Sequence, residues 1–158
     1  MKKSILSGIV GFVLGMIFLG VVGFLAAPGL MILEDVSPLN YEDTISTILE
    51  SAADSGWKVP KTYQLDAAVV EGGYDVLPVS VMELCKPDHA GKVLNEDEGR
   101  IVSSLMPCRI AVYEISDGSV IISRMNSGLV SKVFGGTVAE VMAQASAENE
   151  LILSAVLP

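Results

Sequence analysis

The sequence predicts an α+β domain that follows a single N-terminal membrane-spanning helix. Three observations lead to this prediction. The run Ile5–Ala27 contains no ionisable side chain, and about 20 apolar residues span a hydrocarbon core of roughly 30 Å. Helical and strand-like segments then follow in mixed order, which fits α+β better than a wound parallel sheet. Asp117-Gly118 lies between two apolar runs, which is a strong hairpin signal.

A cleaved signal peptide is the alternative to a permanent anchor. Signal sequences carry an apolar region of about 7–15 residues that ends in a small-x-small cleavage site. Here the apolar run is longer, and the best candidate site, Phe24–Ala27, is followed by Pro28. The sequence therefore favours an uncleaved anchor over residues 1–29 and an exported globular domain over residues 30–158.

Charges on either side of the apolar run predict its orientation. Lys2 and Lys3 precede the run, whereas Glu34 and Asp35 follow it. Because positive residues stay on the cytoplasmic side, we expect an anchor in the cytoplasmic (inner) membrane with its N-terminus in the cytoplasm. The domain is then periplasmic or extracellular.

Small residues form one face of the predicted anchor. Gly11 and Gly15 make a G-x-x-x-G pair, and Ser7 and Gly8 extend the face. Such faces let two helix backbones pack closely, although glycine is common in membrane helices generally. A helix–helix partner is therefore one interpretation, and it leaves open whether that partner is a second copy or a larger membrane complex.

Composition excludes some functional classes. The chain has 158 residues, with 10 basic and 19 acidic side chains, and a net charge of −9. Without Lys2 and Lys3 the net charge is −11. Nucleic-acid binding requires clustered cations, so we do not expect it. About 130 residues beyond the anchor suffice for one domain with its own core.

In the first half of the domain, turn and cap residues separate the expected elements. Leu30–Val36 reads as a strand or an interfacial extension. Asn40 is a suitable N-cap for an amphipathic helix that begins at Tyr41, and Gly56 suits the position just after its C-terminus. The other expected elements are a hairpin of strands Thr62–Val70 and Val76–Cys85 through Gly72-Gly73, and a helix that starts at Pro87.

The second half is expected to continue with helices on both sides of a hairpin. Asn126 is a suitable N-cap, and Thr137 with Glu140 has the spacing of a capping box. The expected elements are a helical stretch Arg100–Met106, strands Cys108–Ile115 and Ser119–Met125, a helix Ser127–Phe134, a helix from Thr137, and a last short helix Glu148–Val156.

The residues with the most chemistry lie at two junctions between strands and helices. Cys85 ends a predicted strand, and His89 lies four residues further on, in the first turn of a helix. Met106 and Cys108 flank Pro107 at the other junction. If both junctions meet at one end of the sheet, Cys85, His89, Met106 and Cys108 converge. We treat all four as candidate cofactor-binding residues, and Cys85, His89 and Cys108 as candidate metal ligands.

Three interpretations of these residues stay open. In the first interpretation the two cysteines form a disulfide, as exported thiols often do. Alternatively, thiolate, thioether and imidazole together hold copper(I), or an axial ligand is supplied to a haem. In the third interpretation the residues are structural, since free cysteines are commonly buried. The chain has none of the G-x-S-x-G, P-loop, G-x-G-x-x-G or H-E-x-x-H motifs, which disfavours an enzyme.

Several segments together resemble a known family. Glu83–Ala90 and Ser103–Glu114 each hold a cysteine near a proline, and Asp117-Gly118 follows. With Tyr41–Thr44 and Gly56–Pro60, these segments resemble the domain of unknown function 302 family over about residues 37–145. Ser123–Asn126 and Phe134–Gly136 look like its membrane-anchored branch.

The resemblance implies a fold but no reaction. It implies a single antiparallel sheet packed by helices, of the TATA-binding-protein-like β-α-β(4)-α class. The family's C-x-P and P-C elements fall on Cys85 and Cys108, whereas His89 is not general to the family.

Taken together, these features predict a membrane-anchored binding domain and favour a non-enzymatic role. Its Cys85/His89/Cys108 end is expected to bind copper or haem, or to act in thiol and sulfur redox chemistry. The alternative is a small structural subunit that docks into a larger membrane or filament assembly through its glycine-rich helix.

Overall fold

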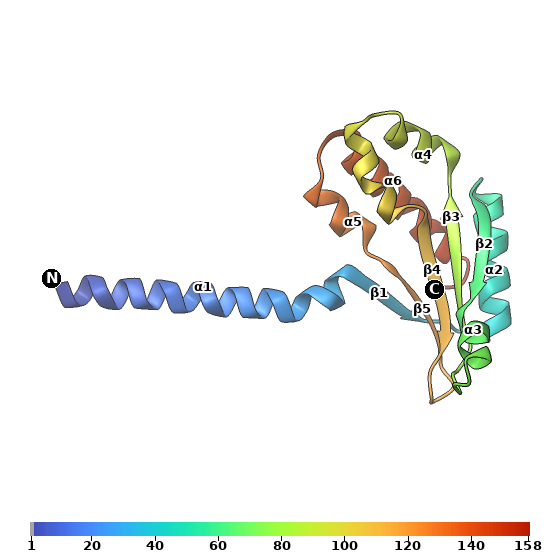
Figure 1. Ribbon diagram of the computed structural model, residues 1–158, viewed down its shortest axis with the longest axis horizontal. Coiled ribbons are helices and arrows are strands. Elements are labelled where there is room, and N and C mark those ends of the chain that lie inside the picture. Colours follow the sequence, from blue (N-terminus) through green and yellow to red (C-terminus); the bar gives the residue numbers. More distant parts are fainter. Residues whose placement is uncertain (1) are drawn as a thin grey trace.

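The computed structural model describes residues 2–158, with side chains described for residue 9 and residues 11–158 (Figure 1). Lys2, Lys3, Ser7 and Gly8, which entered the predictions of orientation and packing, lie outside the described side chains. Helix α1, Lys2–Met31, extends away from the rest of the molecule. Its segment Gly11–Met31 is long and apolar enough to cross a membrane, as expected of the anchor.

The domain is built on one antiparallel sheet of five strands in the order β1-β5-β4-β3-β2. This confirms the predicted α+β class with a single antiparallel sheet packed by helices. The central pairing of β3, β4 and β5 is regular, whereas β2 carries a register shift between Lys58 and Lys61. The strands are β1 Ile32–Val36, β2 Lys58–Gln64, β3 Val79–Cys85, β4 Cys108–Glu114 and β5 Val120–Met125.

Two long helices, α2 and α6, bury one face of this sheet. Helix α2 is Tyr41–Asp54 and α6 is Gly136–Leu153. Their apolar side chains pack with alternate residues of β3, β4 and β5, because alternate strand residues share a face. The resulting core includes Ile48, Ala52, Met82, Leu84, Ile110, Val112, Ile122, Ala145, Ile152 and Leu153.

Shorter helices cover one end of the sheet. They are α4 Pro87–Leu94, the 3₁₀ helix η1 Glu98–Leu105, α5 Ser127–Val130 and the 3₁₀ turn η2 Ser131–Val133. Parts of α4, η1 and α6 enclose a second, smaller cluster of Val93, Val102, Val138 and Val141. This end therefore has its own apolar packing beside the main core.

Several predicted caps and turns are confirmed. The Asn40 side chain accepts a hydrogen bond from the Asp43 N–H at 2.9 Å, which caps α2. Gly56 has φ +74° after that helix, and Gly118 has φ +85° in the β4–β5 turn, where residues other than glycine are disfavoured. Pro87 occupies the first turn of α4.

The predicted strand Thr62–Val70 is wrong beyond Gln64. Helix α3, Leu65–Glu71, follows β2 directly, and β3 starts only at Val79. Asp66 in the first turn of α3 accepts a hydrogen bond from the Val79 N–H at 3.3 Å. The helix thus bridges to the start of the next strand, and the apolar run that looked like a strand is a short surface helix.

The C-terminal part also differs from the prediction. Helix α6 runs unbroken from Gly136 to Leu153, so the separate helix Glu148–Val156 and the capping box from Thr137 are both wrong. The Thr137 hydroxyl instead donates to Glu96 at 2.9 Å, a contact outside its own helix that the local spacing does not reveal.

The anchor joins the sheet directly. Ile32, the first residue of β1, follows Met31, and it pairs with Met125 in β5. The next residue, Asn126, donates from its backbone N–H to Met31 O at 2.7 Å and from its side chain to Leu30 O at 3.0 Å. These bonds satisfy carbonyls at the C-terminus of α1 that lack helical partners, so α1 and the domain form a continuous structure.

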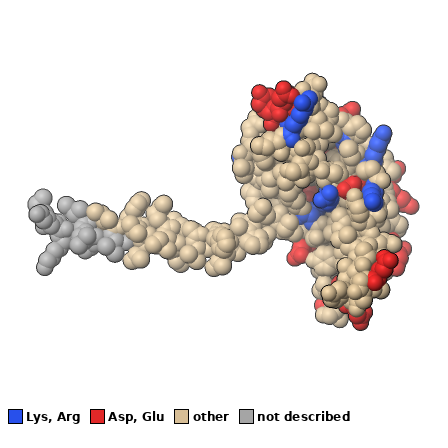
Figure 2. Space-filling model, in the orientation of Figure 1, with Lys and Arg blue, Asp and Glu red and all other residues tan. Residues whose placement is uncertain are grey.

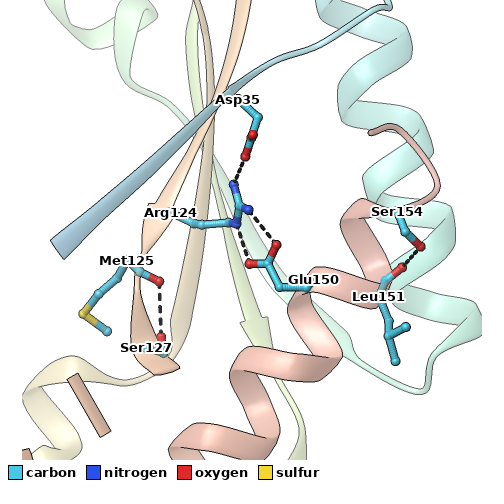
Figure 3. Close-up of polar contacts among 7 residues, drawn as sticks. All are labelled: Asp35, Arg124, Met125, Ser127, Glu150, Leu151 and Ser154. Carbon is cyan, nitrogen blue, oxygen red and sulfur yellow. Dashed lines mark hydrogen bonds and ion pairs between the residues drawn. The ribbon is translucent and has the colours of Figure 1, made fainter. Parts of the chain in front are cut away.

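A buried arginine connects the first strand to the last helix (Figure 3). The Arg124 side chain in β5 is only 8% exposed. It donates from Nη1 to Asp35 of β1 at 2.6 Å, and from Nε and Nη2 to the two oxygens of Glu150 in α6 at 2.8 and 2.6 Å. Burial lowers the pKa of Arg124, but the bonds to Glu150 and Asp35 outweigh burial and raise it, so the guanidinium stays charged.

We predict that Arg124→Met destabilises the domain by about 1–3 kcal/mol, because it leaves two carboxylates without their shared cation. The expected loss of unfolding free energy is smaller than for a fully buried pair, because the two carboxylates are partly exposed to water. Urea unfolding of the full chain in detergent measures it. The matched control is Arg109→Met, whose side chain is 59% exposed with one contact to Glu83 at 3.2 Å, where about 0–1 kcal/mol is expected. Equal losses for the two variants would contradict the prediction.

Candidate functional site

The four predicted site residues lie in four successive parts of the chain and line one cavity. Cys85 ends β3, His89 lies on α4, Met106 follows η1, and Cys108 begins β4. The cavity has a volume of about 60 Å³. The structure thus brings together the four residues that the sequence analysis singled out.

The remaining walls of this cavity are mostly apolar. It lies between the main core and the smaller cluster around Val93, with Leu84 and Trp57 on one side and Val102 and Val141 on the other. Two further thioethers, Met125 and Met142, also line it. We call it the sulfur cavity, after its five sulfur-bearing residues Cys85, Met106, Cys108, Met125 and Met142.

The two cysteines approach the cavity differently. In the β3–β4 register Cys108 lies opposite Leu84, and Cys85 is paired with Lys58 of β2. Because successive strand residues point to opposite faces, Cys108 shares the core face with Leu84, and Cys85 takes the alternate position at the strand end. Both are half-buried free thiols in the described part of the chain.

The surroundings of Cys108 favour its neutral thiol form over the thiolate. Burial raises its pKa, a hydrogen bond from the Asn149 side chain lowers it, and the nearby Cys85 raises it, with burial the largest effect. Asn149 is itself buried, and its Oδ1 has no hydrogen-bond partner among the described residues. A thiolate at Cys108 therefore requires a compensating positive charge within the cavity.

His89 is only 6% exposed, and the hydrogen-bonding capacity of its ring nitrogens is poorly satisfied. Its Nε2 lies 3.1 Å from Glu148 Oε1, but out of line for a hydrogen bond, and its Nδ1 has no partner in the described part of the chain. The Trp57 ring lies at 5.6 Å with the planes tilted by 60°. A buried imidazole nitrogen without a partner is costly, and it marks a position where a ligand would be stabilised.

Glu148 of α6 holds this end of the site together. Its carboxylate accepts hydrogen bonds from Lys86 Nζ at 2.7 Å, Trp57 Nε1 at 2.9 Å and Gln144 Nε2 at 3.1 Å. Burial raises the pKa of Glu148, but the contacts from Lys86, His89 and Trp57 outweigh it and lower the pKa to about 2. Glu148 is therefore a fixed negative charge beside His89.

The site fits a small ion better than a large cofactor. Pockets that enclose ligands of drug size measure about 300–1,000 Å³, so this cavity cannot enclose a haem. Among the described side chains, no three His, Cys, Asp or Glu residues group closely enough to hold a metal ion. A metal site here therefore has to include thioether sulfur as well as Cys85, His89 or Cys108.

Sequence reasoning missed the contribution of α6. Met142, Glu148 and Asn149 surround the site, yet none was singled out. One signal was available: Val141, Ala145, Asn149 and Ile152 follow a helical period, and all four are buried. A lone Asn in an otherwise apolar helical face is unusual, and it points to a polar partner such as the Cys108 thiol.

A second, more open pocket of about 310 Å³ adjoins the sulfur cavity. The two share Leu105, Pro107 and Met125 as walls, and the second also reaches Ile32, the residue directly after the anchor helix. The cavity therefore lies close to the junction of anchor and domain.

Comparisons with known proteins agree with this fold. The family model described as "Domain of unknown function DUF302" matches residues 34–156. The crystal structure of an uncharacterized conserved protein DUF302 from Bacillus stearothermophilus is similar, with a TM-score of 0.70 and 23% identity, over 80% of this chain and 98% of that chain. At this identity the likeness shows the fold alone. No curated protein matches the chain.

We predict that Glu148→Gln weakens the domain most above pH 5. The folded-state pKa of Glu148, about 2, lies below the ordinary value of 4.5 for a glutamate. Its charge therefore stabilises the fold above about pH 4.5, and this contribution is lost as the pH falls toward 2. Urea unfolding of both proteins across pH 2–7 should show a gap that narrows on acidification.

The control is Glu140→Gln, an exposed residue on the same helix, for which a much smaller gap is expected. A Glu148→Gln gap that is constant with pH, or no larger than that of the control, would show that Glu148 is not held as a stabilising charge.

Proposed function

This chain belongs to the DUF302 family of domains of unknown function, whose family model matches residues 34–156. We propose that its domain binds a soft monovalent metal ion, Cu(I). The observation that carries the proposal is the sulfur cavity, which collects thiol, thioether and imidazole donors in one small apolar space. Soft sulfur ligands select Cu(I) over the harder divalent ions.

Cys108 and Met106 are the central ligands in this proposal, with His89 and Cys85 at the rim. Met106 and Cys108 are separated only by Pro107, and both line the cavity. The unpartnered Nδ1 of His89 supplies a nitrogen donor. Binding a cation would release the Cys108 proton and give the buried thiolate the positive charge that it lacks in this site.

The same features favour binding over catalysis. A reactive cysteine needs a lowered pKa, whereas burial raises the pKa of the Cys108 thiol. The site is thus suited to retain an ion within an apolar lining.

We further propose that the domain works at the outer face of the cytoplasmic membrane. The support is the apolar helix Gly11–Met31, preceded in the sequence by Lys2 and Lys3 and followed by Glu34 and Asp35. Metal binding in that location would place the site next to the bilayer, since β1 follows α1 directly.

We predict that the full chain, purified in detergent and kept reduced, binds one Cu(I) in competition with a chromophoric Cu(I) chelator. Cys108→Ser and Met106→Leu should each lower the affinity by at least about 10–100-fold, the loss seen when even a supporting residue of a metal site is removed. Cys85→Ser and His89→Asn test the rim in the same titration.

The matched control is Met82→Leu, a methionine fully buried in the main core that does not line the cavity. It should bind Cu(I) like the unmodified chain, because Met and Leu have similar volumes. Equal affinities for Met82→Leu, Met106→Leu and Cys108→Ser would refute the proposed site.

A second candidate function is that of a structural subunit whose anchor packs against another helix. In the described part of α1, a Cβ added to Gly11 or Gly15 meets no atom within 4 Å. That face is therefore open to a partner, which the pattern of small residues favours.

We predict that Gly11→Leu with Gly15→Leu abolishes helix-dependent cross-linking of the full chain in membranes, because leucine prevents close backbone approach. Val13→Ala with Ile17→Ala, at exposed apolar positions on the opposite face of the same helix, serves as the control. Cross-linking that persists in the glycine variant, or is absent from the unmodified chain, argues against this second function.

A further inference from the structure

We propose that α5 and η2 form a second contact with the bilayer that α1 crosses, with Leu129 and Val133 in the interfacial layer. The inference rests on the anchoring of α1 under the proposed function. It concerns the position of the domain on the membrane and does not depend on the metal site.

The end of the anchor sets the depth of this segment. No charged residue lies between Lys3 and Glu34, and this stretch is longer than the about 20 residues that span a hydrocarbon core of roughly 30 Å, so its C-terminal end reaches the far side of the bilayer. Leu30 and Met31 therefore lie at the membrane boundary. Asn126 bonds to both of their carbonyls, at 3.0 and 2.7 Å, and Asn126 is also the N-cap of α5. Helix α5 therefore begins at the membrane surface.

The side chains of α5 and η2 suit that depth. Val133 is 82% exposed and Leu129 is 36% exposed, although both are apolar. Lys132, between them, is exposed as well. A short segment with apolar side chains and a basic residue is the composition that binds at a lipid interface. Beyond Phe134 the surface changes, because Glu96 and Glu98 line a pocket there with Thr137.

Charge also distinguishes this segment from the rest of the domain. The chain has 19 acidic residues, yet none lies between Asp117 and Glu140, a stretch that contains Arg124 and Lys132. An acidic domain is repelled by anionic lipid head groups. Residues 118–139, which include α5 and η2, are thus repelled less than the acidic parts of the domain, which include Glu34 and Asp35 of β1.

The figures agree with this placement. Figure 1 shows α5 on the side of the domain from which α1 extends. In Figure 2 the surface above the anchor on that side is mostly uncharged, and acidic residues lie at the top, on the opposite side and just below the junction of anchor and domain.

The test is lipid quenching of tryptophan fluorescence in the full chain. The protein is reconstituted in vesicles of phosphatidylcholine with a minor share of phosphatidylglycerol, with or without phosphatidylcholine brominated near the head-group end of its acyl chains. The variants are Val133→Trp, Phe18→Trp within α1 as the anchor control, and Tyr74→Trp as the matched exposed control. The native Trp57 is buried and gives a common background. Tyr74 follows α3, away from the anchor (Figure 1).

We expect blue-shifted emission from Val133→Trp and a loss of that emission in brominated vesicles. For Tyr74→Trp, the loss of emission in brominated vesicles should be no greater than that of the native background. Quenching of Phe18→Trp without any of Val133→Trp would overturn the second contact and leave the anchor intact. Absence of quenching from both would overturn the anchor and the contact together. Equal quenching of Val133→Trp and Tyr74→Trp would show nonspecific adsorption and would also overturn the contact.

Discussion

The site depends on one constraint, which is the fixed orientation of α6 about its own axis as it packs on the sheet. Three consecutive residues of this helix fix it. At 100° per residue, Glu148 and Glu150 point to either side of Asn149. Glu150 binds the buried Arg124 of β5, and Glu148 binds Lys86 and Trp57 at the opposite flank. Asn149 is thereby held facing inward, against Cys108. Arg124 extends the same constraint to Asp35 of β1, next to the anchor.

The sulfur cavity follows from this arrangement because it lies where two apolar clusters meet. The smaller cluster around Val93 is separate from the main core, and the buried His89 lines the cavity between them. Thiol and thioether groups tolerate such a boundary, being polarizable and only weakly polar. In our account an ion completes what the protein leaves unsatisfied: it replaces the proton of Cys108 and engages His89.

Local signals in the sequence predicted the fold where structure is determined locally. Asn40, Gly56, Pro87 and Gly118 each fit one backbone geometry, and each lies where it was expected. Prediction was wrong where distant contacts decide: α3 forms where a strand was expected, and α6 runs through Glu148. The convergence of Cys85, His89, Met106 and Cys108 was predicted from their junctions. Their partners Glu148 and Asn149 were not, because nothing near them in sequence shows which strand or helix they face.

Copper K-edge X-ray absorption of the Cu(I)-loaded full chain tests the central claim most directly, since it reports the atoms bound to the ion. The account predicts a first coordination shell dominated by sulfur, which loses sulfur scatterers when Met106 or Cys108 is replaced and keeps them when Met82 is replaced. A shell of oxygen and nitrogen only, or a sulfur shell indifferent to Met106 and Cys108, would contradict it.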